Sequence, residues 1–185
     1  MDLRRALPRP FYQTATGAGA EARPTALDEG MLLLRIVVGL TMAAHGTQKL
    51  FGWLGGPGFS GTANFLGGMG FRPGALHAAL SGGSELGGGL LLAFGLLTPL
   101  GAAAVTGSML AAIATVTWQN GFISAKGGYE LSAVLIGGAL AIAWVGPGQF
   151  SLDRILGLEL SGRRWGLAAA VLGAVTAAGV LAFRQ

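Results

Sequence analysis

Five long apolar stretches constrain this chain more than any other feature. They cover roughly residues 31–54, 74–97, 100–118, 129–146 and 165–183, and a helix needs about 20 apolar residues to cross a bilayer. Only 11% of the 185 residues are charged and 52% are hydrophobic, whereas a soluble domain carries about 25% charged residues. The sequence therefore predicts an all-α integral membrane protein and excludes a soluble or disordered chain.

Glycine and cysteine content narrow the range of functions further. The 34 glycines follow no triplet repeat, so the chain is not collagen-like. Within membrane helices, glycine permits close packing of neighbouring backbones. The sequence has no cysteine, which excludes disulfide exchange, thiolate metal sites and iron–sulfur ligation by this chain. Any redox role then requires a bound cofactor or a partner.

The charges flank the apolar stretches rather than forming a nucleic-acid face. Residues 1–30 are rich in proline and glycine, which predicts a flexible arm and argues against a signal peptide.

The distribution of Lys and Arg predicts the topology. Because membrane proteins keep these residues on the cytoplasmic side, their uneven distribution predicts a multi-pass protein of the inner (plasma) membrane with a cytoplasmic N-terminus. The basic residues expected inside are Arg4, Arg5, Arg9, Arg23, Arg154, Arg163 and Arg164, against Arg72, Lys126 and Arg184 outside.

Two of the connections between the apolar stretches differ in length and composition. Leu97 to Leu100 is a tight turn in which Pro99 is suited to open a helix. Residues 55–73 form a long glycine-rich connection, within which residues 60–66 predict a short helix at the membrane interface.

Ionisable residues inside a span are costly and commonly mark a site or a pathway. His45 and Lys49 lie four residues apart on one face of the first span, and His77, Ser81 and Glu85 share a face of the second. We expect these faces to meet in the outer half of an antiparallel bundle. The ends of the third and fourth spans add Trp118, Gln119, Asn120, Tyr129 and Glu130 to the same outward-facing region.

Structural interpretations stand beside these functional ones. Glu85 paired with Lys49 or His45 could be a purely structural buried ion pair. His77 lies nearer the water, which favours an interfacial residue, and Trp118 and Tyr129 are typical of the aromatic belt. Trp53 is also typical of the belt. We expect Arg35 to reach the inner surface or to cap a structural contact, and Asp153 and Arg154 to begin a cytoplasmic segment with a structural role. A metal site of His45, Glu85 and Glu130 is disfavoured because the cation of Lys49 lies one helical turn from His45.

Several motifs in order resemble those of the DoxX family of membrane proteins. They are His45–Thr62 (HGTQKLFGWLGGPGFSGT), Glu85, Trp118–Phe122 (WQNGF) and Gly127–Glu130 (GGYE), and the resemblance covers roughly residues 30–157. The resemblance implies a four-helix transmembrane bundle over 31–157, preceded by the arm at 1–30 and followed by an additional transmembrane helix at 158–185.

The resemblance also implies a function and a set of site residues. Members have been linked to membrane oxidoreductase activity, including a thiosulfate:quinone oxidoreductase in archaea and an actinobacterial complex with a superoxide dismutase and a sulfurtransferase. The positions carried over are Arg35, His45, Lys49, Glu85, Trp118, Asn120, Tyr129 and Glu130. The family often has a histidine where this chain has Thr117, which puts a mechanism with two imidazoles in doubt.

Three functions remain open at this stage. The first is an oxidoreductase component that binds a quinone or a small redox molecule, with His45, Glu85 and Lys49 as catalytic residues and Trp118, Asn120, Tyr129 and Glu130 as cofactor contacts. The second is a non-catalytic scaffold for redox enzymes, and the third is a small-solute permease. Residues 165–183 carry two ridges of small residues, which predict a packing or partner-docking helix and a possible oligomer through this segment.

Overall fold

The computed structural model describes residues 24–185, and within them every regular element is helical. The helices are α1 (Ala26–Phe51), α2 (Gly58–Gly68), α3 (Gly74–Phe94), α4 (Thr98–Ala112), α5 (Glu130–Val145), α6 (Leu152–Ile155) and α7 (Arg163–Ala182). Single helical turns lie at Trp53–Gly55, Trp118–Asn120 and Ser124–Lys126, and a π-helical turn lies at Ile113–Thr117. The five predicted apolar stretches are therefore helical, and the predicted short helix at 60–66 lies within α2.

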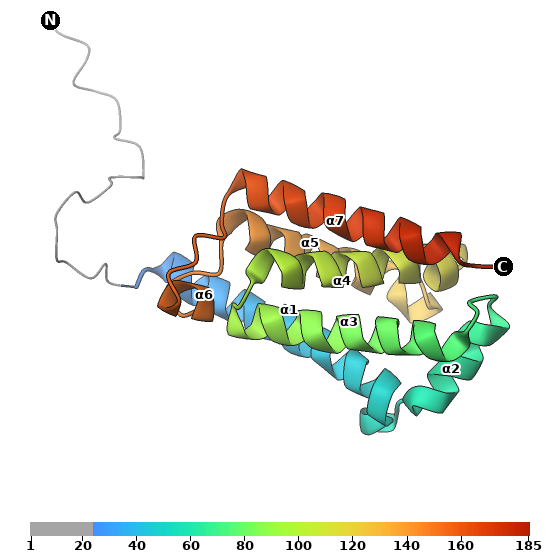
Figure 1. The fold of residues 1–185 in the computed structure, drawn as a ribbon. Helices are drawn as coiled ribbons and strands as arrows, with labels where there is room; N and C mark the ends of the chain where they lie inside the picture. Colours follow the sequence, from blue (N-terminus) through green and yellow to red (C-terminus); the bar gives the residue numbers. More distant parts are fainter. Residues whose placement is uncertain (1–23) are drawn as a thin grey trace, which may run out of the picture.

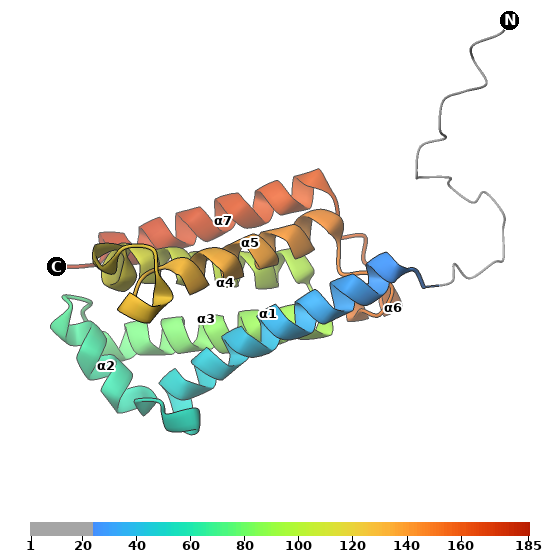
Figure 2. The same cartoon turned by 180° about the vertical axis from the view of Figure 1, so that it is seen from behind.

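The long helices lie side by side in two layers (Figures 1 and 2). One layer contains α3, α4 and α7, with α4 in the middle, and the other contains α1 and α5. Helix α1 packs along α3, while α4 packs against α3, α5 and α7. Helix α2 lies at one end of the molecule, near the end of α7, and α6 lies at the opposite end (Figure 1). We call these the α2 end and the α6 end.

The start of α1 is set by its capping residues. The Thr25 side chain accepts a hydrogen bond from Asp28 N, and Asp28 Oδ2 in turn accepts from Thr25 N at 2.8 Å, which satisfies the free amides of the first turn. Helix α1 therefore begins at Ala26, within the segment 1–30 predicted as an arm, and residues 1–23 lie outside the described part of the chain. Burial acts to raise the pKa of Asp28, but hydrogen bonds from Thr25 and from Gln149 N outweigh it and hold that pKa below its ordinary value.

Glycine brings α1 and α3 into backbone contact, as the sequence predicts. A Cβ atom at Gly39 would lie 2.6 Å from the Gly89 carbonyl oxygen, and one at Gly89 would lie 2.5 Å from Gly39 O. No side chain fits at either position, because real Cβ contacts are longer. The close approach places the polar faces of the two helices against each other further along their length.

Helix α7 packs inside the chain through one of its two small-residue ridges. Ala169, Gly173 and Ala177 are buried, and Gly173 faces Thr106 of α4 closely enough that a Cβ would lie 2.8 Å from the Thr106 Cβ. This ridge therefore serves α4. The neighbouring ridge, which includes Ala174 and Ala178, is exposed.

Two of the helical segments are long and apolar enough to cross a membrane by length and composition. They are Thr98–Asn120 and Arg163–Ala182, with mean hydropathies of 1.6 and 1.9 over their most apolar windows. Glu130–Val145 is apolar but shorter. Helices α1 and α3 contain the ionisable residues and the small polar residues that form the site below.

Candidate functional site

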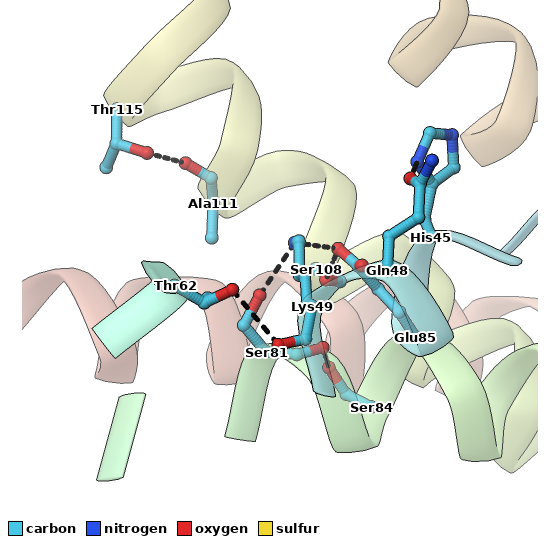
Figure 3. A network of polar contacts seen from close by, with 10 residues as sticks. All are labelled: His45, Gln48, Lys49, Thr62, Ser81, Ser84, Glu85, Ser108, Ala111 and Thr115. Carbon is cyan, nitrogen blue, oxygen red and sulfur yellow. Dashed lines mark hydrogen bonds and ion pairs between the residues drawn. The ribbon is translucent and has the colours of Figure 1, made fainter. Parts of the chain in front are cut away.

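A buried ion pair joins α1 to α3 near the α2 end. Lys49 Nζ lies 2.5 Å from Glu85 Oε1, and Lys49 Nζ also donates to Ser81 Oγ at 2.8 Å. The Glu85 side chain is 1% exposed and that of Lys49 is 30% exposed. The sequence prediction that the two polar faces meet is therefore confirmed for Lys49, Ser81 and Glu85 (Figure 3).

The two oxygens of Glu85 are in different situations. Oε1 accepts from Lys49 and from Ser108 Oγ of α4, the latter at 2.9 Å. Oε2 is buried and has no hydrogen-bond partner among the described residues. A buried carboxylate oxygen without a donor is costly, so Glu85 offers one free acceptor position.

Helix α2 is held against this cluster by a short polar contact. Thr62 Oγ1 lies 3.1 Å from the Lys49 carbonyl oxygen and 2.8 Å from Gly58 O, and its hydroxyl is the donor of the contact (Figure 3). Thr62 is itself buried. The last turn of α1, which carries Lys49, is therefore fixed by α2 as well as by α3.

A cavity of about 1220 Å³ adjoins the ion pair. Most of its wall is apolar, and side chains from α1, α2, α3, α4, α5 and α7 contribute to it. Its polar members include His45, Lys49, Glu85, Ser108 and His77. Ligand sites typically have this character: a largely apolar concave surface with a few polar groups.

The two histidines both line the cavity, but neither contacts the ion pair. His45 Nδ1 lies 3.2 Å from Gln48 Oε1, and no hydrogen bond joins His45 to Lys49 or Glu85 within the described residues. His77 is only 6% exposed, its ring lies 5.1 Å from that of Phe71, and its Nδ1 has no partner in the described chain. His77 is therefore buried against Phe71 rather than open to water, and its interpretation as an interfacial residue stays a prediction.

The end of α4 changes its helical form where it borders the cavity. Residues Ile113–Thr117 form a π-helical turn, a feature frequent at functional sites. Thr115 and Thr117 line the cavity, and Thr117 Oγ1 is buried without a partner among residues 24–185. Thr117, the residue before Trp118, therefore faces the cavity.

The four predicted cofactor contacts lie at the rim of the site, outside the cavity lining. Trp118 stacks on Tyr129 with ring centroids 5.3 Å apart. Asn120 Nδ2 donates to Gly127 O at 3.1 Å, and Glu130 Oε2 accepts from Ser124 N at 2.9 Å. The structure does not bring Glu130 to Lys49 or Glu85; its carboxylate instead accepts from the Ser124 amide in the 121–128 loop. The ligand-binding role of these four residues stays a prediction.

A second buried polar cluster lies at the α6 end. Asp153 accepts from Leu97 N at 2.7 Å, from Thr98 N at 3.0 Å and from Thr98 Oγ1 at 2.6 Å. Arg35 is fully buried and donates to Phe150 O at 2.5 Å. Both residues have structural contacts at the start of α4 and in the 146–151 loop, in agreement with their structural interpretation. Within residues 24–185, no three His, Asp or Glu side chains gather closely enough to hold a metal ion.

Comparison with known proteins identifies the family of this chain. The DoxX family model matches residues 30–118. The chain is 30% identical over 131 residues to "Inner membrane protein YqjF" of Escherichia coli (strain K12), an alignment that covers 70% of this chain and 93% of the relative. The chain belongs to the DoxX family. It is a membrane protein, and the resemblance inferred from its motifs is confirmed.

The name of a second relative includes an enzymatic activity. The chain is 30% identical over 124 residues to "Putative oxidoreductase CatD" of Bacillus subtilis (strain 168), covering 67% of this chain and 84% of the relative. No solved structure matches the chain. The matched DoxX region contains Lys49, Glu85 and Ser108 and ends at Trp118, so Tyr129, Glu130 and α7 lie beyond it.

Sequence reasoning missed two members of the site. Ser108 contacts Glu85 directly, and its signal was a hydroxyl within the apolar run of α4. Thr62 fixes the end of α1; it is the last residue of the DoxX-like motif His45–Thr62, but the sequence assigned it no role in the site. The cavity itself has no sequence signal, because it depends on how side chains from six helices fill space.

Proposed function

We propose that this DoxX protein is a membrane component of an oxidoreductase system and binds a quinone or a similar small redox molecule in the cavity beside Lys49 and Glu85. The observation that carries the proposal is the buried Lys49–Glu85 pair with one free carboxylate oxygen at the wall of a large apolar cavity. Membership of the DoxX family and the likeness to a relative named as an oxidoreductase support it.

The groups of the site suit a redox head group that gains or loses protons. An ammonium group has three donors, and Lys49 uses two of them on Glu85 and Ser81. The third would donate to a carbonyl oxygen of the head group and stabilise negative charge on it. Glu85 Oε2 and His45 would exchange the protons, since both groups line the cavity.

Electrons must come from outside this chain. Reduction of a quinone head group takes up two electrons and two protons, and the sequence has no cysteine to supply electrons as a thiol. The donor is therefore a partner enzyme or a diffusible reductant such as a sulfur anion. Trp118, Asn120, Tyr129 and Glu130 would form the rim through which the site meets that donor, since Thr117 and Leu131 beside them line the cavity.

The proposed placement in the membrane follows the charge bias. Helices α1, α3, α4 and α5 would form a four-helix transmembrane bundle over 31–157, with α7 as an additional span within 158–185. The N-terminus and the α6 end, with Arg154, Arg163 and Arg164, would face the cytoplasm, and the α2 end would face outward. The exposed ridge of α7, within 165–183, would meet lipid or a second copy.

Single substitutions at the proton-exchanging residues test the proposal. Glu85→Gln and His45→Gln preserve shape, so the expected result is a fall of about tenfold or more in quinone-linked turnover with folding retained. Turnover is measured in membranes that carry each variant at matched protein level. Glu29→Gln, on the exposed first turn of α1, is the control and should keep full turnover. Unchanged turnover in both site variants would overturn the redox proposal and favour a scaffold.

A further inference from the structure

The cavity continues into a groove along the side of the molecule. Leu76 and Leu80 of α3 form one edge, Leu172 and Val180 of α7 form the other, and Ala104 of α4 lies on its floor. Helices α3 and α7 each pack on α4, which lies between them in Figure 1. The groove is therefore one helix wide and runs along α4.

The edges of this groove are open to the surroundings. Leu80 is 51% exposed, Leu172 is 44% exposed and Leu100, near the α6 end of the groove, is 49% exposed. These side chains lie on the flank of an apolar helix layer, which in a membrane protein faces acyl chains rather than water. An opening here connects the cavity with the bilayer.

The α2 end of the groove is closed by a contact between the α2–α3 connection and the residues after α7. Gln185 N donates to Gly70 O at 2.9 Å, and Arg184 Nε donates to Met69 O at 3.0 Å. The Arg184 guanidinium also lies over the ring of Phe71, which is buried and lines the cavity. This contact covers the groove between α3 and α7 at its α2 end, whereas the leucines along the side of the groove are exposed.

The polar groups inside the cavity indicate which chemical group a ligand would present to them. Glu85 Oε2 is an acceptor without a donor among residues 24–185, and Lys49 Nζ lies 2.5 Å from the other carboxylate oxygen, Oε1. A hydroxyl group supplies the missing donor, whereas a free anion would be repelled by the carboxylate. The apolar groove beyond suits a chain attached to that head.

We infer that the site takes a long-chain amphiphile from the bilayer, which enters sideways between α3 and α7 and donates a hydroxyl hydrogen bond to Glu85 Oε2. The inference rests on the proposed function and deepens it. It names the ligand class as a membrane-soluble, chain-bearing hydroxyl compound, such as the hydroquinone that quinone reduction yields, rather than a water-soluble redox anion.

Filling the groove tests the route of entry. The double variant Leu80→Trp/Leu172→Trp places two indole rings at its edges. Its matched control, Leu90→Trp/Val171→Trp, adds the same rings to exposed positions of the same helices that do not line the cavity. The full chain is placed in lipid nanodiscs, and binding of decylhydroquinone, tailless hydroquinone and 1-decanol is measured per mole of lipid.

We expect the groove variant to weaken decylhydroquinone binding by about tenfold or more and the control to change it less than about twofold. Tailless hydroquinone should bind wild type and groove variant equally. Equal loss in the groove variant and the control overturns the inference, as does decylhydroquinone binding that the groove variant leaves unchanged. The single variant Leu172→Trp repeats the comparison with Val171→Trp where the double variant lowers the yield of folded protein.

The remaining outcomes separate this inference from the proposed function. If 1-decanol binds as tightly as decylhydroquinone and shows the same loss in the groove variant, the groove is supported and the redox assignment fails. If quinone-linked turnover depends on Glu85 but is indifferent to Leu80→Trp/Leu172→Trp, the redox assignment stands and entry through the groove is overturned.

Discussion

Glu85 and Asp153 are both buried carboxylates, but their surroundings differ. Asp153 is fully buried, and both of its oxygens accept hydrogen bonds. Oδ1 accepts from Leu97 N, and Oδ2 accepts from Thr98 N and Thr98 Oγ1. Glu85 has one oxygen bonded to Lys49 and Ser108, while the other has no partner among the described residues and belongs to the wall of a cavity of about 1220 Å³.

This difference suggests a structural role for the buried carboxylate of Asp153 and supports the ligand-binding role that we propose for that of Glu85. Asp153 satisfies the amides at the start of α4, which would otherwise be buried without acceptors, so its contacts account for its presence. The contacts of Glu85 do not, because an apolar pair of similar volume is often as stable as a buried ion pair. The binding role that we propose would account for the free oxygen and the adjoining space.

The largest effect is expected from Asp153→Ala. The substitution leaves three donors at Leu97 and Thr98 buried without an acceptor, and hydrogen bonds to a charged group contribute about 1.5–3 kcal/mol each. We expect the free energy of unfolding to fall by about 3–5 kcal/mol, measured by denaturation in detergent. Arg154→Ala, one residue away and exposed, should change it by less than about 0.5 kcal/mol. Equal stability of the two variants would end the structural assignment of Asp153.

Lys49→Met should lower the free energy of unfolding by a smaller amount, about 2 kcal/mol, because it leaves Glu85 without its cation. Adding Glu85→Leu should recover most of that loss, since no charge then remains buried, while ligand binding stays lost. Denaturation and ligand titration of the single and double variants test this. Failure of the double variant to recover stability would make the ion pair structural, like Asp153.

Trp118→Ala should lower the free energy of unfolding by about 1 kcal/mol, because Tyr129 loses the ring stacked on it. Ligand affinity should change by less than about twofold, since neither ring lines the cavity. Denaturation and ligand titration on one preparation give both values. A loss of affinity of about tenfold or more would instead place Trp118 among the ligand contacts, as the sequence predicts.

The smallest effect concerns Asp28 at the start of α1. Its pKa is lowered in the folded protein, so its stabilising contribution is present above its unfolded pKa of about 3.9 and is lost as the pH falls through the lower, folded pKa. Asp28→Asn should destabilise the protein by about 0.5 kcal/mol at neutral pH. Denaturation over a pH series should show the difference shrinking below about pH 4, and a difference that grows there would contradict the assignment.

The sequence predicts most of the fold because the helices follow from local pattern. Apolar length located all five long helices, and the four-residue spacing of His45 and Lys49 together with Ser81 and Glu85 identified the two faces that meet. The ridge Ala169, Gly173 and Ala177 was also recognisable, although its partner is α4 of the same chain.

Contacts between residues far apart in sequence escape this reasoning. Asp153 meets Thr98 across 55 positions, and Ser108 approaches Glu85 from a helix of low polarity. Glu130 was expected to join Lys49 and Glu85, but as the first residue of α5 it bonds to the nearby amide of Ser124. Local donors compete well with distant ones because they require less ordering of the chain.

Ligand-induced stabilisation tests the distinction between the two carboxylates most directly. The midpoint of thermal unfolding is measured with and without saturating decylhydroquinone for wild type, Glu85→Gln and Asp153→Asn. We predict that the ligand raises the midpoint of wild type and of Asp153→Asn, whose ligand-free midpoint is lowered. Glu85→Gln, whose ligand-free midpoint is also lowered because the ion pair with Lys49 is lost, should show no rise. An equal rise in Glu85→Gln and wild type would contradict the assignment of Glu85 to a ligand site.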